Sequence, residues 1–296
     1  MLFRARQFEF RFPRPALVMG IVNVTPDSFS DGGKFFIPEV AVAHALELVA
    51  QGADILDIGG ESSRPGAEPV GETEELWRVI PVIEKLAGQV KIPLSIDTMK
   101  PAVARAALSA GASVVNDVGA SRADDAMGRI VAEFQAGYIC MHASASGKTG
   151  VSPDQLHQIV KLAKNQAGTG IVQDVSDFFQ ERLRRLNGCG VASEQVVFDP
   201  GIGFGKTLEQ NLSLLAGLEN FKKCGRPLLL GVSRKSFIGK ILGPGTNERL
   251  PASLACATLA LANGVQIIRT HDVAETVQAL RMAEAILARR INVEIL

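Results

Sequence analysis

Acidic and amide side chains recur at the ends of short apolar runs in this chain of 296 residues, and Asp97, Asn116 and Asp199 are three of them. A carboxylate accepts hydrogen bonds from a ring N–H and a neighbouring amine together, and an asparagine both donates and accepts. A carboxylate buried without a basic partner is costly, and a ligand that donates hydrogen bonds would relieve that cost. These residue types therefore predict a site for a planar heterocycle that is rich in donors.

Asp97 also has a simpler interpretation. Aspartate is a common N-cap, and a helix is expected to begin near Lys100, three residues later. Asp199 is less suited to capping, because Pro200 and Gly201 follow it directly. For Asp97 both interpretations, ligand-binding residue and helix cap, remain open at this point.

A second group of residues suits an anion. Asn23 ends the first long apolar run, Arg64 follows Glu-Ser-Ser at 61–63, and Arg269 and His271 close the last run. Guanidinium groups bind phosphate oxygens through paired hydrogen bonds. Asn23 offers an oxygen for Mg2+ shared with a diphosphate, since this ion keeps waters and uses few protein ligands. Taken alone, Arg64 would more simply be a surface ion-pair residue.

Eight short runs rich in valine and isoleucine carry these residues. The runs do not alternate polar with apolar residues, which is typical of parallel strands covered on both faces by helices. Eight strand–helix units in a chain of this length favour a single (β/α)8 barrel, an α/β fold, with a doubly wound open sheet as the alternative. The runs lie at 17–23, 53–59, 93–97, 113–117, 137–142, 195–201, 228–233 and 265–271.

The expected helices between these runs end near glycines. Segments 39–53, 72–89, 100–112 and 252–264 reach Gly52, Gly88, Gly111 and Gly264, and glycine suits a left-handed C′ position. In a barrel the C-terminal ends of all strands lie at one face. The scattered polar residues, with Ser-Arg-Lys-Ser at 233–236, would then line one pocket.

Two further sequence features have structural interpretations. The segment GIGFGKT (201–207) resembles a phosphate loop, but Pro200 stands where that motif needs its first glycine. Its glycines are expected to form a mobile loop that brings Phe204 near the pocket. Trp77 is expected to pack a helix, and the role of His142 is left open.

Composition excludes several classes of partner. The chain has 31 basic and 31 acidic residues, which is poorly matched to nucleic acid or an anionic membrane. Its four cysteines form no C-x-x-C pair, as expected for a cytoplasmic protein with reduced thiols. No signal peptide or membrane span is predicted. Residues 1–16 are interpreted as an N-terminal extension or β-hairpin, and 17–296 as the barrel.

Seven motifs resemble those of the dihydropteroate synthase family. They are GIVNVTPDSFSDGG (20–33), DIGGESSRPGA (57–67), SIDT (95–98), NDV (116–118), DPGIGFGK (199–206), GVSRKSFIG (231–239) and RTHDV (269–273). The resemblance spans about residues 17–285. It implies a TIM-barrel transferase of folate biosynthesis that joins p-aminobenzoate to 6-hydroxymethyl-7,8-dihydropterin diphosphate, using Mg2+, as a homodimer and a sulfonamide target. The electron-rich dihydropterin would favour carbon–oxygen cleavage ahead of attack.

The resemblance also implies roles for particular residues. The pterin would be held by Asp97, Asn116, Met141, Asp199, Gly231 and Lys235. The diphosphate would be held by Asn23, Arg269 and His271, with Asn23 also on the metal. The p-aminobenzoate would lie near Ser63, Arg64, Pro65, Phe204 and Ser236. Asp97, Lys235, Arg269 and His271 would be catalytic, whereas Arg234 is expected to point away as a structural ion-pair residue.

Two departures from the family pattern stand out. Residues 141–148 lack the usual second methionine, glycine–proline pair and Met-Gln, and Ser63 replaces a commoner threonine, a loss of one methyl contact worth about 1 kcal/mol. The altered loop leaves one rival function open, a non-catalytic pterin-binding homologue. A second rival, a methyltetrahydrofolate-binding methyltransferase domain, needs no diphosphate site and no Ser-Arg-Lys segment, so the sequence disfavours it.

Overall fold

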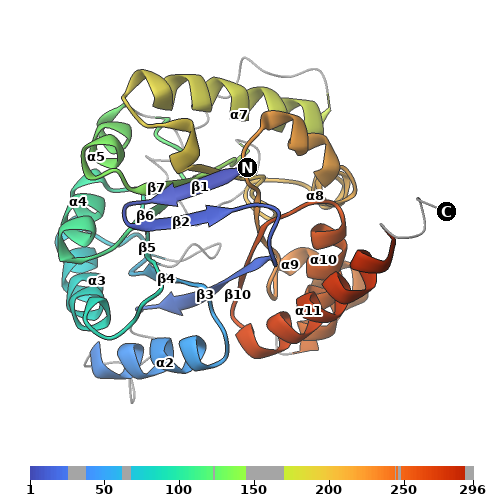
Figure 1. Ribbon diagram of the computed structural model, residues 1–296, viewed down its shortest axis with the longest axis horizontal. Coiled ribbons are helices and arrows are strands. Elements are labelled where there is room, and N and C mark those ends of the chain that lie inside the picture. Colours follow the sequence, from blue (N-terminus) through green and yellow to red (C-terminus); the bar gives the residue numbers. More distant parts are fainter. Residues whose placement is uncertain are drawn as a thin grey trace.

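The computed structural model describes residues 1–25, 38–61, 68–122, 124–144, 170–243, 245 and 248–290. Eight parallel strands form the centre of the molecule, and the helices surround them as an outer ring (Figure 1). The strands are β3 (Leu17–Asn23), β4 (Ile55–Gly59), β5 (Leu94–Asp97), β6 (Val114–Asp117), β7 (Gly137–Met141), β8 (Val196–Asp199), β9 (Leu229–Gly231) and β10 (Ile267–Thr270). Each lies within one of the eight predicted runs.

The sheet closes on itself. Its strand order is β8-β7-β6-β5-β4-β3-β10-β9, and every neighbouring pair is parallel. The two terminal strands meet through a parallel bridge between Phe198 and Leu228, and the Phe198 N–H donates to the carbonyl of Pro227 at 2.9 Å. The prediction of a (β/α)8 barrel is therefore confirmed, and the open-sheet alternative is wrong.

The helices follow their strands in the expected order. They are α2 (Pro38–Ala50), α3 (Glu72–Ala87), α4 (Pro101–Ala110), α5 (Ala126–Phe134), α7 (Ile171–Gly188), α8 (Leu208–Ala216), α9 (Ser236–Leu242), α10 (Leu250–Ala262) and α11 (Val273–Arg290). Gly52, Gly111 and Gly264 have positive φ, as predicted for helix ends. Gly88 has a φ of −85°, so the prediction of a left-handed conformation is wrong at this position. Trp77 on α3 is 54% exposed, so its side chain is not part of the buried core. No described helix has the length and apolarity needed to span a bilayer.

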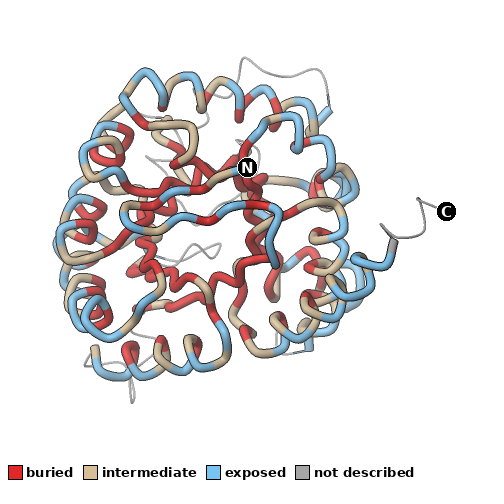
Figure 2. Tube along the Cα trace, in the orientation of Figure 1, coloured by how far each residue is buried: buried red, intermediate tan, exposed pale blue. Residues whose placement is uncertain are grey.

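Alternation along the strands divides the core in two. One set of side chains, such as Val18 and Val22 on β3, packs outward against the helices. The other set, such as Leu17 and Met19, packs inside the ring. The strands are buried almost throughout, while exposed residues lie on the outer helices (Figure 2). The period of two therefore assigns each strand residue either to the helix layer or to the barrel interior.

An antiparallel pair, β1 (Leu2–Ala5) and β2 (Phe8–Arg11), lies across one end of the barrel (Figure 1). Phe3, Ala5 and Phe10 pack with the inward apolar residues nearest the N-terminal ends of the strands. Arg6, in the turn between β1 and β2, donates to the carbonyls of Leu108 and Ala112 at 2.9 and 2.8 Å. The interior of the barrel is therefore filled with apolar side chains at its base.

Candidate functional site

Polar residues occupy the inward face of the strands at their C-terminal ends. In register, Asn23 on β3 lies beside Gly59, Gly59 beside Asp97, and Asp97 beside Asn116. Asp199 pairs with Met141 on β7. Two positions before these residues the same face carries apolar side chains of the interior core, such as Val114, Ile139 and Val197. The predicted pterin-binding residues are thus brought together at one barrel mouth.

Arg269 of β10 links two carboxylates at this mouth. Its Nε donates to Asp57 at 2.6 Å, and its Nη2 donates to Asp97 at 2.8 Å. Asn116 Nδ2 donates to the same oxygen of Asp57 at 2.9 Å. Asp97 therefore has a basic partner within the chain, Arg269.

The capping interpretation of Asp97 is wrong. Lys100 is the N-cap of α4, and no side chain caps that helix. The Lys100 N–H instead donates to Thr98 Oγ1 at 3.1 Å. Asp97 is thus left to the barrel interior, where its side chain is 16% exposed.

Burial changes the acidity of the groups in the mouth. Burial raises the pKa of Asp97 to about 7, since it outweighs the opposing charge of Arg269, and nearby Asp57 raises it further. Burial also raises the pKa of Asp199, although Lys235 opposes this effect. The pKa of Lys235 falls to about 8, again mainly through burial. Groups that change protonation near neutrality in a cleft are typical of binding and catalytic sites.

The loop after β8 approaches neighbouring backbone closely. Gly201 and Gly205 have φ of 65° and 66°, and an added Cβ would lie 2.0 Å from the His142 carbonyl oxygen or 2.1 Å from that of Ser144. Lys206 Nζ donates to the carbonyls of His142, Gly201 and Phe204 at 2.9, 2.8 and 3.3 Å. The glycines therefore permit close packing, whereas the sequence suggested a mobile loop.

Phe204 lies at the mouth, as predicted. Its ring centroid is 4.4 Å from Lys235 Nζ, which also donates to the Ile202 carbonyl. A cation over an aromatic face is stabilised by the ring quadrupole. The loop after β8 thus orients the ammonium group that follows β9.

The segments after β9 and β10 contact each other at two points. Ser233 Oγ lies 2.9 Å from His271 Nδ1 and accepts from the His271 N–H at 3.2 Å. Arg234 Nε donates to Asp272 Oδ2 at 3.0 Å, which confirms the structural ion pair predicted for Arg234. Arg234 has a φ of 55°, a strained value for a residue with a side chain. These contacts fix the backbone just before Lys235.

The remaining predicted residues divide into described and undescribed positions. Ser236 is exposed at the start of α9, and Gly231 ends β9 beside Arg269. Ser63, Arg64 and Pro65 lie outside the described residues. His142 is buried against the edge of Phe178 with ring centroids 5.0 Å apart, and burial holds its pKa well below the usual range, which makes it a neutral core residue.

Two contributors to the site were missed. Asp57 is fully buried and accepts from both Arg269 and Asn116, and its position two residues after Ile55 already placed it on the inward face. Lys206 was seen only as part of a glycine-rich motif, and nothing in the spacing indicates that its ammonium joins three backbone carbonyls.

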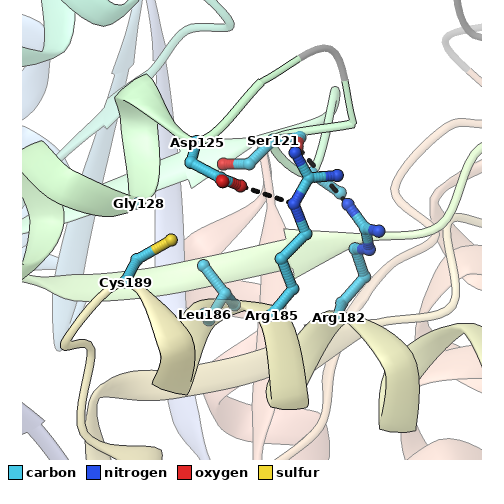
Figure 3. Close-up of a pocket in the computed structure, with 8 residues that line it drawn as sticks. Ser121, Asp125, Gly128, Arg182, Arg185, Leu186 and Cys189 are labelled. Carbon is cyan, nitrogen blue, oxygen red and sulfur yellow. Dashed lines mark hydrogen bonds and ion pairs between the residues drawn. The ribbon is translucent and has the colours of Figure 1, made fainter.

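A small cavity lies elsewhere, between α5 and α7 on the outside of the barrel (Figure 3). Arg182 and Arg185 extend from α7 toward Ser121 and Asp125, and Arg185 pairs with Asp125. Its volume of about 10 Å³ suits one water molecule at most. This cavity is too small for a substrate, so the barrel mouth remains the candidate site.

Comparison with known proteins agrees with this geometry. Residues 19–271 match the family described as pterin binding enzymes. The dihydropteroate synthase of Escherichia coli strain K12 is 44% identical over 277 residues, which is 93% of each chain. This chain belongs to the dihydropteroate synthase family. The prediction of a transferase of this kind in folate biosynthesis is therefore confirmed.

Solved structures of the family share the fold and carry relevant ligands. The enzyme from Clostridium difficile, solved with pteroic acid, is 43% identical with a TM-score of 0.85 and covers 94% of this chain and 98% of its own. The enzyme from Xanthomonas albilineans, solved with 4-aminobenzoic acid, is 42% identical with a TM-score of 0.84 and covers 97% and 98%. That from Yersinia pestis, solved with a sulfonamide drug complex, is 40% identical with a TM-score of 0.83 and covers 97% and 100%.

Proposed function

We propose that this member of the family joins p-aminobenzoate to 6-hydroxymethyl-7,8-dihydropterin diphosphate, with release of pyrophosphate. The observation that carries the proposal is the cluster of Asp57, Asp97, Asn116, Asp199 and Arg269 at one closed barrel mouth. Such an array of acceptors beside a cation matches a heterocycle with several N–H groups that bears an anionic leaving group.

The pterin ring is held by groups of complementary polarity. The Asp97 and Asp199 carboxylates accept from ring and exocyclic N–H groups, and Asn116 both donates and accepts. Lys235 donates to a carbonyl or ring nitrogen. Met141 is buried beside Asp199, and an added Cβ at Gly231 would meet only the Arg269 Cβ at 3.9 Å, so both positions suit contact with a flat ring.

The leaving diphosphate is stabilised by Arg269 on β10 and by His271, just after that strand. Within the described residues, Arg269 uses Nε and Nη2 for carboxylates, and its Nη1 makes no hydrogen bond, which leaves that group for a phosphate oxygen. His271 lies two residues after Arg269, just beyond the end of the strand. The dihydropterin stabilises positive charge on its methylene carbon, so we propose that the carbon–oxygen bond breaks ahead of attack. Preorganised charges at the departing oxyanion then lower the energy of the reaction's transition state.

Mg2+ fits this arrangement through Asn23. By alternation Asn23 shares the inward face with Leu17 and Met19, and its side chain has no hydrogen-bond partner in the described part of the chain. No group of three or more His, Cys, Asp or Glu side chains among the described residues could hold a metal ion. One amide oxygen, phosphate oxygens and water are together a common magnesium environment. When bound, the ion would neutralise charge on the diphosphate.

The arylamine is held beside Phe204, with Ser236 able to reach its carboxylate. An arylamine is mostly unprotonated at neutral pH, so the residues contribute by orientation, and no strong base is required. Ser63, Arg64 and Pro65 complete this subsite in our proposal. The complex of the Yersinia pestis enzyme with a sulfonamide supports the further proposal that sulfonamides compete with p-aminobenzoate here.

One assay tests the reaction. The purified chain should form dihydropteroate and pyrophosphate from the two substrates, and removal of Mg2+ with a chelator should abolish formation. A non-catalytic homologue would bind the pterin without pyrophosphate release. A methyltetrahydrofolate-binding domain would bind the folate without requiring diphosphate. Absence of turnover with both substrates and Mg2+ would refute the proposal.

We also propose a homodimer that works in the cytoplasm. Leu259 on α10 and Met282 and Ile286 on α11 are 65%, 63% and 53% exposed, and the two helices are adjacent (Figure 1). Apolar patches of this kind often form protein interfaces. Sedimentation of Leu259→Glu should show a monomer where the wild type is a dimer. The four cysteines are free thiols, which supports a reducing compartment.

A further inference from the structure

Ser233 makes contacts that no role described above requires. It lies two residues after β9, its side chain is buried, and the residue is 8% exposed. Its Oγ has two partners among the described residues, and both belong to His271. One is the backbone N–H at 3.2 Å, and the other is the ring atom Nδ1 at 2.9 Å.

A count of hydrogens decides the direction of the second contact. The backbone N–H of His271 can only donate, so Ser233 Oγ accepts there. The hydroxyl has one hydrogen of its own, and Nδ1 is the only partner in the described part of the chain that can receive it. If Nδ1 carried hydrogen instead, the buried hydroxyl hydrogen would have no acceptor, which is unfavourable. Nδ1 is therefore the acceptor.

We propose that Ser233 is a positioning residue that holds neutral His271 in the tautomer with its hydrogen on Nε2. A neutral imidazole has one N–H, and the hydrogen bond made by one nitrogen determines the state of the other. Ser233 thereby fixes both which nitrogen is a donor and how the ring is turned.

The surrounding backbone keeps this geometry in place. Arg234 and Asp272, the residues that follow Ser233 and His271, form an ion pair with Nε to Oδ2 at 3.0 Å. The Asp272 N–H donates to Thr270 Oγ1 at 3.1 Å. Strands β9 and β10 pair up to Gly231 and Arg269 before the serine–histidine contact, and the Arg234–Asp272 ion pair joins the two segments after it. The backbone therefore holds His271 beside Ser233.

The consequence for catalysis rests on the proposed function. A departing diphosphate needs a hydrogen-bond donor, and the Nε2–H tautomer supplies one without prior protonation of the ring. The opposite tautomer would present a lone pair at Nε2 to an anion. Ser233 would then raise turnover although it contacts no substrate atom.

Nitrogen NMR of the full-length protein tests the tautomer directly. The chain has four histidines, and protein with 15N-labelled histidine would be measured about two pH units above the ordinary histidine pKa. The His271 signals are those missing from His271→Gln. We expect an unprotonated Nδ1 and a protonated Nε2 in the wild type. A protonated Nδ1 would overturn the proposal, and this measurement needs no folded variant of Ser233.

Variants separate positioning from general stability. Ser233→Ala should bring a population with hydrogen on Nδ1 and lower kcat about tenfold, on the order of one hydrogen bond, with the KM for p-aminobenzoate unchanged. Ser233→Thr should restore both the spectrum and kcat. Ser113→Ala is the matched control, because Ser113 is 1% exposed and its Oγ has no described partner.

Two outcomes distinguish failure of this proposal from failure of the proposed function. A His271 spectrum that is the same in Ser233→Ala and the wild type would overturn the positioning role, whatever the kinetics. A wild type that forms no dihydropteroate would refute the proposed reaction, while the Nε2–H spectrum would still support the tautomer.

Discussion

Asp57→Asn should move the acid limb of pterin binding to lower pH. Asp97 and Asp57 both contact Arg269, and the charge of Asp57 is one cause of the raised pKa of Asp97, after burial. The substitution preserves the shape of the side chain and an oxygen that can accept from Arg269 and Asn116. It removes only the negative charge, so the Asp97 carboxylate ionises more readily.

The size of the shift follows from the geometry. At an effective dielectric constant of about 20, a unit charge about 12 Å away changes a pKa by about one unit. Two carboxylates that share one guanidinium are closer than that, so the pKa of Asp97 should fall by at least about one unit. In the wild type, with a pKa of about 7, the proton on Asp97 must be lost before it can accept, so affinity falls about tenfold for each pH unit below 7.

Calorimetric titration with the pterin diphosphate over a range of pH measures this effect. At a pH about two units below the wild-type midpoint, wild-type affinity should be about a hundredfold below its maximum, and that of Asp57→Asn about tenfold below. Asp54→Asn is the control, because Asp54 accepts from the Val18 N–H at 2.9 Å at the other end of β4. An acid midpoint in Asp57→Asn equal to or above that of the wild type would refute the electrostatic coupling.

Three further predictions concern the mouth and its loop. Lys235→Met should lower turnover about a hundredfold, on the order of one key donor, whereas Lys240→Met on α9 should leave steady-state turnover near wild type. Gly201→Ala should lower the melting temperature much more than Gly225→Ala, since both have positive φ but only the first Cβ would meet a carbonyl oxygen, at 2.0 Å. Asp97→Asn should weaken pterin binding in calorimetry. It should also raise the melting temperature above pH 7 but not below pH 4. The reason is that the pKa of Asp97 is raised in the folded state, so the wild-type protein loses stability as pH rises from the unfolded pKa toward about 7.

The fold was predictable because its signals are local. Each strand is a short apolar run bounded by polar residues, and β3 coincides with the predicted run at 17–23. Parallel strands with helical crossovers leave few topologies, and closure places all C-terminal ends at one face. The meeting of Asp97, Asn116 and Asp199 followed from the architecture alone, without knowledge of any side-chain contact.

The pairings within the site were not predictable in the same way. Arg269 was assigned to an anion, and its contacts with Asp57 and Asp97 join residues 212 and 172 positions apart. Which cation meets which carboxylate depends on side-chain reach across a closed ring, and no spacing in the sequence records it. Asp57 could have been found by counting alternate residues from Ile55, which would have placed it on the inward face.

The apolar base and the polar mouth depend on each other. Phe3 and Phe10 fill the base of the barrel and exclude water from beneath the charged layer, so that burial becomes the largest cause of the raised pKa of Asp97. In the free protein this layer holds several carboxylates in a poorly solvated place, which costs stability. A ligand that brings N–H donors removes that cost on binding. The same burial that lowers the stability of the free protein therefore strengthens its preference for a heterocycle rich in donors.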